Sequence, residues 1–441
     1  MFKSKKIFAI VALVIACVLC FCACSSNKTN DSTNEGNNSG NVIAKGDDIS
    51  STASMSDKAY AIWDESKASL CFVRLAKTPK AGDVINKSIS ITEYFEIDEN
   101  EVGAVTPPWT HLAHRICTVL VTEPVQPKST ANWFKDFVGC DRFDLSGLDT
   151  TYTINMNSMF SNACTYIEMV EISLSELKVE NVTNAREMFA DFASESVEVK
   201  LLGLYNWKFD NLVDGSAMFE DFAKAATTVE FDSMENFGMT KLENASSMFC
   251  GACKAATEFK LTGIELWNMG SLLEASCMFN RAGESATTWN IGNIGKWKIA
   301  KVTLVHNMFD GAALNATSFD IGDIGAWNMS SVAYADSMFM NCAPKATSWG
   351  IGDIGAWNTE NLEFCHNMFS GAANMAQSFA IGDIGNWDMS KVTNMDGFFN
   401  NAGSAAEHVY IGDLSKWDVS NVQSHVEFTN NEKIVAPNFT N

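Results

Sequence analysis

The dipeptide Met-Phe returns at a nearly constant interval over more than half of the chain. The interval is 29 residues once and 30 residues thereafter, and Phe398-Phe399 continues the series. The methionines of these pairs are Met159, Met188, Met218, Met248, Met278, Met308, Met338 and Met368. A self-similarity of this length is typical of a solenoid, in which each repeat is one coil that cannot bury its apolar face alone.

Each repeat has two halves with different apolar spacings. One half carries a stripe formed by Val182, Ala185, Met188, Phe189, Phe192 and Ala193. Offsets of three, four and seven residues predict a short amphipathic helix. The other half alternates, as in Trp289-x-Ile291 and Phe319-x-Ile321, and then reaches a Gly-Asp pair. This half predicts a short strand followed by a turn.

The array therefore predicts an α/β fold, a leucine-rich-repeat-like solenoid over residues 129–430. We expect about ten coils of 26–30 residues, and a right-handed winding, because parallel strands joined through a helix wind that way. Residues 56–128 predict a small β-rich unit that covers the first coil, with a hairpin formed by the apolar runs 59–63 and 70–73. Residues 431–441 remain as a C-terminal tail or cap.

The N-terminus resembles a bacterial lipoprotein signal peptide, residues 1–24. Three lysines precede an apolar run over residues 7–19, and residues 21–24 form a cleavage site that ends at Cys24, the expected lipidation site. Cys17 is the alternative, with a shorter apolar run before it. Residues 25–55 are mostly Ser, Asn, Thr, Gly and Asp, a composition that predicts a disordered tether. The expected location is the bacterial membrane, with a lipid anchor and an exterior-facing solenoid.

The charge balance argues against one class of partner. The chain has 53 acidic and 31 basic residues and a net charge of −22. Because such a surface repels phosphates, we expect no nucleic-acid partner.

Several segments carry a resemblance to a known family. They are 144–150 with 155–160, 387–395 and 417–422. These segments resemble the repeat of BspA-like leucine-rich-repeat surface proteins, also found in Mycoplasma lipoproteins, over residues 130–430. The resemblance implies surface display and, for some members, adhesion or host interaction, and it supplies no catalytic residues. An Ile-Gly-Asp-Ile-Gly extension makes this repeat longer than the family's usual length of about 25 residues.

One column of equivalent positions is rich in tryptophan. Its tryptophans are Trp207, Trp267, Trp297, Trp327, Trp357, Trp387 and Trp417. A recurring aromatic in a solenoid is typical of a core ladder, and Leu148, Leu177 and Phe237 in the same column favour that interpretation. The alternative is a flat platform for sugars, which requires exposed rings.

A second column holds carboxylates beside glycine, at Asp323, Asp353, Asp383 and Asp413. Stacked carboxylates repel one another, so a cation such as Ca²⁺ is one interpretation. Ordinary turn chemistry, with each aspartate bonded to a nearby amide, is the other.

Cys250-x-x-Cys253 similarly allows a zinc or redox role or simple buried thiols. We expect no cofactor.

We find no sequence motif of a nucleophile elbow, a zinc protease or a phosphate loop. Scattered carboxylates leave a surface hydrolase as an alternative. The sequence predicts a non-catalytic, lipid-anchored surface protein whose solenoid mediates contact with extracellular protein, matrix or host cells, with carbohydrate binding by the tryptophan column as the second hypothesis.

Overall fold

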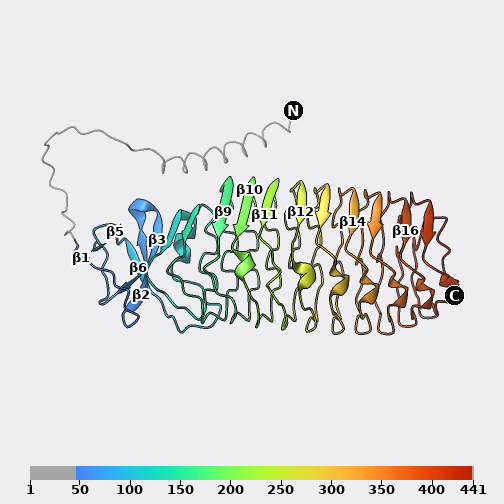
Figure 1. Cartoon of the computed structure of the whole chain (residues 1–441), viewed down its shortest axis with the longest axis horizontal. Coiled ribbons are helices and arrows are strands. Elements are labelled where there is room, and N and C mark those ends of the chain that lie inside the picture. The colour runs from blue at the N-terminus through green and yellow to red at the C-terminus, as the bar shows by residue number, and fades with distance from the viewer. Residues whose placement is uncertain (1–45, 440–441) are drawn as a thin grey trace, which may run out of the picture. The chain divides into compact units, whose positions relative to one another are not determined.

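The computed structural model of the protein describes residues 46–439, which belong to one compact unit (Figure 1). The signal segment with Cys24 and Cys17, and residues 25–45 of the expected tether, lie outside the described residues. Residues 46–55 of that tether are described. There the prediction of disorder is wrong, because strand β1 (Asp48–Ile49) pairs in parallel with β4 (Val84–Ile85) and Ile49 is buried.

The N-terminal unit is built on the expected hairpin, which the structure confirms. β2 (Lys58–Asp64) and β3 (Ser69–Leu75) are antiparallel and are joined by the 3-10 helix η2 (Glu65–Lys67). The five-stranded sheet has the order β6-β2-β3-β7-β8. Its remaining strands are β6 (Glu93–Glu96), β7 (Thr118–Val121) and β8 (Arg142–Asp144). β5 (Ile89–Ser90) extends the small sheet of β1 and β4, and η3 (Thr110–Arg115) precedes β7.

The rest of the described chain is a stack of coils, each contributing one strand to the same side (Figure 1). The strands that pair are parallel and in register, as in Val199↔Val170 and Val199↔Val229, and they form four short sheets along the stack. The strands are β9 (Met169–Ser173), β10 (Glu198–Leu202), β11 (Thr228–Phe231), β12 (Glu258–Lys260), β13 (Thr288–Asn290), β14 (Ser318–Asp320), β15 (Ser348–Gly350), β16 (Ser378–Ala380) and β17 (His408–Tyr410). The prediction of a repeat solenoid with short strands is confirmed.

The prediction of a short α-helix in each coil is wrong. Between residues 46 and 439 the helices are 3-10 segments only. In the coil around Phe189, residues Glu187 and Asp191 have φ of 55° and 56°, which an α-helix does not tolerate. Their amides point to the next coil, and that of Phe189 donates to the carbonyl oxygen of Met218 at 2.8 Å. Hydrogen bonds between coils replace those along a helix.

Short 3-10 helices follow the strands instead. They are η4 (Leu204–Asn206), η5 (Ile264–Leu266), η6 (Ile294–Lys296), η7 (Ile324–Ala326), η8 (Ile354–Ala356), η9 (Ile384–Asn386) and η10 (Leu414–Lys416). The Ile-Gly-Asp-Ile-Gly extension thus forms a corner between the strand and the next turn. In the described part of the chain, no helix has the length and apolar character needed to span a membrane.

One hydrophobic core runs from the N-terminal sheet through all the coils, from Ala59 to Ile434. Phenylalanines of the Met-Phe pairs stack along it. Phe189 and Phe219 have ring centroids 5.4 Å apart and planes inclined by 6°. Each coil therefore buries its apolar residues against its neighbours, as a solenoid requires.

Candidate functional site

The tryptophan column is buried in the core. Its seven rings are at most 5 % exposed. Trp267, Trp297 and Trp327 stack with centroids 6.4 Å apart. Every indole Nε1 of the column donates a hydrogen bond to a backbone carbonyl oxygen. That of Trp297, for example, donates to Ile264 at 2.9 Å. No ring face is open to a sugar, so the hypothesis of a sugar platform in this column is wrong.

The aspartate column forms helix caps. Asp323, Asp353, Asp383 and Asp413 each precede a 3-10 helix and accept a hydrogen bond from the amide two residues later. These bonds measure 2.9–3.0 Å. Hydrogen bonds from Ser415 also lower the pKa of the Asp413 carboxyl. Among residues 46–439 there is no group of three His, Cys, Asp or Glu side chains placed to hold a metal ion.

Cys250 and Cys253 are thiols on the wall of one coil. Cys253 is buried, and Cys250 is half-buried, with burial raising the pKa of its thiol to about 12. A thiol with so high a pKa is a poor nucleophile and a poor metal ligand at neutral pH.

A column of hydrogen-bonding residues changes character along the stack. At Asn155, Asn184, Asp214, Asn244 and Asn394 the side chain accepts a hydrogen bond from the amide two residues later. The equivalent residues of three consecutive coils are Leu304, Tyr334 and Phe364, connected by parallel bridges. We call these three residues the apolar strip.

The apolar strip is open to solvent. Tyr334 is 39 % exposed and Phe364 is 38 % exposed. Their rings stack with centroids 4.6 Å apart and planes inclined by 6°. The strip thus places two stacked rings on the surface, in a column that elsewhere is polar.

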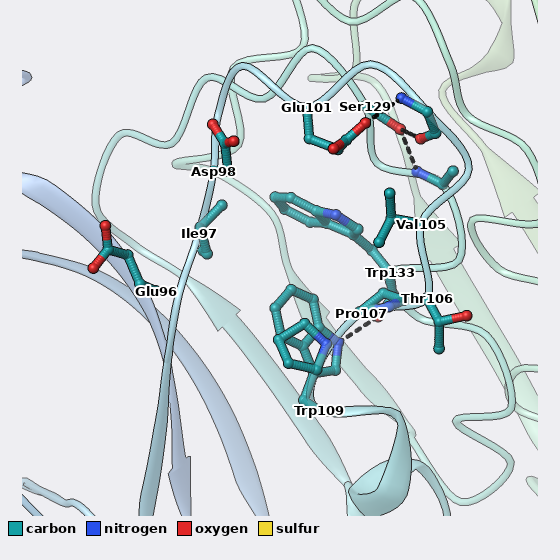
Figure 2. A pocket seen from close by; sticks show the side chains of 13 residues that line it. Glu96, Ile97, Asp98, Glu101, Val105, Thr106, Pro107, Trp109, Ser129 and Trp133 are labelled. Atoms are coloured by element: carbon teal, nitrogen blue, oxygen red, sulfur yellow. Dashed lines mark hydrogen bonds between the residues drawn. The ribbon is translucent and has the colours of Figure 1, made fainter.

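A pocket of about 190 Å³ lies between the N-terminal sheet and the loop that follows β6. In the view of Figure 2, the indole of Trp133 lies between Ile97 and Val105, with Trp109 beside it and Glu101 at the rim. We call this the cap pocket. Its lining comprises Glu96, Ile97, Asp98, Glu101, Gly103, Val105, Thr106, Pro107, Pro108, Trp109, Ser129, Ala131 and Trp133.

The loop over the cap pocket is tied to the coils beneath it. Glu99 forms an ion pair with the buried Arg74 and accepts a hydrogen bond from the amide of Gln126 at 2.6 Å. Ser129 Oγ donates to the carbonyl oxygen of Gly103 at 2.6 Å. These contacts hold the pocket open in a defined shape, with exposed carboxylates on its edge.

Sequence reasoning missed both features. The sequence did contain a signal for the strip, because aligning the repeats shows Leu304, Tyr334 and Phe364 where other coils have polar residues, most often Asn. The cap pocket was not, because residues 97–108 have no periodicity and reach Trp133 only through the tertiary fold.

Comparison with known proteins gives a family and no activity. No curated protein and no solved structure matches the chain. A family described as "Mycoplasma protein of unknown function, DUF285" matches in four overlapping segments, residues 128–255, 217–348, 249–380 and 345–439. These segments cover the stacked coils and more than half of the chain. The protein therefore belongs to the DUF285 repeat family.

Proposed function

We propose that this protein is a non-catalytic, lipid-anchored bacterial surface protein that binds an extracellular protein or matrix component through the apolar strip. The observation that carries the proposal is the exposed stack of Tyr334 and Phe364. Stacked aromatic anchors supply binding energy at low entropic cost, because their side chains are already fixed before the partner arrives.

The folding stability of the coils does not explain why the strip is apolar. In five other coils the same position bonds a backbone amide, which contributes about 1 kcal/mol. Tyr334 and Phe364 give up that bond and expose apolar surface to water. Their mutual stacking offsets a similar amount, about 0.5–1.5 kcal/mol. Replacing the hydrogen bond with the stacked rings brings no clear gain in folding stability. A partner that covers the rings is the most direct explanation of the replacement.

A non-catalytic role is supported by the state of the thiols. Burial raises the pKa of Cys253, Cys342 and Cys365 above the ordinary value for cysteine, which leaves these thiols protonated. The recurring carboxylates of the aspartate column are engaged in capping 3-10 helices.

The finer features of the fold are also part of this proposal. We infer a right-handed winding and about ten coils, on the rule for parallel strands joined by a crossover connection. The relation to BspA-like leucine-rich-repeat proteins rests on the resemblance of the repeats in sequence.

Two variants test the role of the strip. The double variant Tyr334→Asn/Phe364→Asn should restore the polar column and abolish binding to immobilised extracellular matrix proteins. The control is Tyr152→Asn/Tyr166→Asn, since these tyrosines are also exposed, at 60 % and 65 %. Equal binding by both double variants would refute the role of the strip.

Anchoring is tested separately, in cells fed with labelled palmitate. Cys24→Ser should abolish incorporation of the label and release the protein from membranes, whereas Cys17→Ser should leave both unchanged. Membrane association of the Cys24→Ser variant, with Cys17 intact, would contradict the assignment of the lipid site.

A further inference from the structure

The cap pocket carries more negative charge than the cations around it neutralise. Its lining includes three carboxylates, of Glu96, Asp98 and Glu101, and no lysine, arginine or histidine. Glu96 is paired with Lys58 at 2.8 Å. Within residues 46–439, Asp98 and Glu101 have no ion pair, and each is exposed. The protein's net charge of −22 adds to the negative potential at this rim.

The inner wall of the pocket is aromatic and has an unused donor. Trp109 is fixed, because its Nε1 donates to the carbonyl oxygen of Trp133 at 2.9 Å. Trp133 is only 6 % exposed, and its own Nε1 donates to no atom of the described residues. Within the described residues, the side-chain nitrogen and oxygen atoms that are closed off from solvent and form no hydrogen bond are Nε1 of Trp63 and Nε1 of Trp349. Nε1 of Trp133 is therefore not sealed, and Trp133 lines the cap pocket.

These features fit one kind of occupant. A cation is attracted by carboxylates. An indole N–H needs an acceptor, such as a peptide carbonyl oxygen. A pocket of about 190 Å³ has room for one long side chain. We propose that the cap pocket binds a lysine or arginine side chain of a basic peptide segment, with Asp98 and Glu101 facing the cation and Trp133 donating to the peptide backbone.

Binding at the cap pocket is independent of the apolar strip, because the two share no residue. It goes beyond the proposed function by naming the chemistry of a second partner contact. Failure of one therefore leaves the other unaffected, and separate variants test them.

The probe is the blocked peptide acetyl-Gly-Lys-Gly-amide, titrated into the full chain labelled with ¹⁵N at tryptophan. The indole N–H resonance of Trp133, assigned by its loss in Trp133→Phe, should shift in a saturable way. The arginine peptide should act likewise. Acetylation of the lysine Nζ removes the charge at nearly the same length, and it should weaken binding by roughly tenfold or more.

Variants of the rim separate specific recognition from general charge. Asp98→Asn and Glu101→Gln should each weaken binding about two- to fivefold, the range for exposed ion pairs. The matched control is Glu360→Gln, which removes one exposed carboxylate elsewhere. Trp133→Phe keeps an aromatic ring but removes the donor, and it should weaken binding roughly three- to tenfold when followed through the Trp109 resonance.

Three results would overturn the proposal. The first is no shift of the Trp133 resonance with either cationic peptide at millimolar concentration. The second is an equal shift with the acetylated peptide or with a neutral sugar, which would make the pocket an uncharged-ligand site. The third is unchanged affinity in Asp98→Asn, Glu101→Gln and Trp133→Phe, provided that the other indole resonances show that each variant is folded.

Discussion

Two stacked phenylalanines allow the energetic account of the coils to be tested within one chain. Phe309 is fully buried, and its ring stacks between Phe279 and Phe339, with centroids 5.4 Å from each. Phe364 stacks on one side, against Tyr334 at 4.6 Å, and is 38 % exposed. Substituting each by alanine removes the same atoms from two different environments.

The expected costs differ severalfold. Phe309→Ala leaves a cavity between two coils, and buried Phe→Ala substitutions cost about 3–5 kcal/mol. Phe364→Ala removes one stacking contact, about 0.5–1.5 kcal/mol, and leaves no enclosed cavity because water fills the space. We therefore expect a difference of at least about 2 kcal/mol between the two variants in the free energy of unfolding.

Urea denaturation followed by far-ultraviolet circular dichroism measures both values. Because coils interact only with their neighbours, Phe309→Ala should also broaden the transition, as one part of the stack unfolds before the other. Equal destabilisation by the two variants would refute the reasoning. It would mean that the apolar strip is a structural element, and the argument for its role in binding would fail with it.

Three further outcomes follow from the coils. Burial, above all, and neighbouring carboxylates raise the pKa of Glu220. The contribution of Glu220 to folding stability is therefore present below its pKa in the unfolded chain and is lost as the pH rises through its pKa in the folded protein. Glu220→Gln should therefore raise the melting temperature at pH 7 but not at pH 4. The control Glu230→Gln should leave the melting temperature unchanged at both pH values. Gly382→Ala should destabilise the chain by about 1–3 kcal/mol, because φ of Gly382 is +88° and the new methyl group would collide with Asp353 Oδ1. Gly350→Ala is the control and should be tolerated, because the atom nearest to the new methyl group is 3.7 Å away. Millimolar Ca²⁺ or a chelator should leave the melting temperature unchanged, since capping already occupies the aspartate column, and a rise with Ca²⁺ in differential scanning fluorimetry would contradict that assignment.

The repeat spacing predicted which residues are buried better than it predicted the backbone. Met188, Phe189 and Phe192 are all fully buried, as the stripe required. The same offsets, however, fit a series of tight turns whose amides bond to the next coil, as that of Phe189 does to Met218. Left-handed backbone recurs at Asp191 and at the equivalent Gly251, Gly311 and Gly371 of later coils. Glycine and aspartate favour that conformation, so this column carried a warning against a helix that the apolar spacing alone did not give.

The two candidate surfaces differ in how far the sequence could reveal them. The apolar strip is a departure from a pattern, and a repeat protein supplies its own reference, since each coil shows what stability alone selects at a position. Trp133 has no such reference, because it lies where the first coil meets the N-terminal sheet and is used as a core residue, stacked against Phe72 at 5.3 Å. Only the structure shows that one atom of this buried ring, Nε1, remains without an acceptor in a pocket that is also lined by Asp98 and Glu101, neither of which forms an ion pair within residues 46–439. For chains of this kind, a functional position within the array is best sought as an exception among aligned coils, and one at the end of the array as an unsatisfied group in the packing.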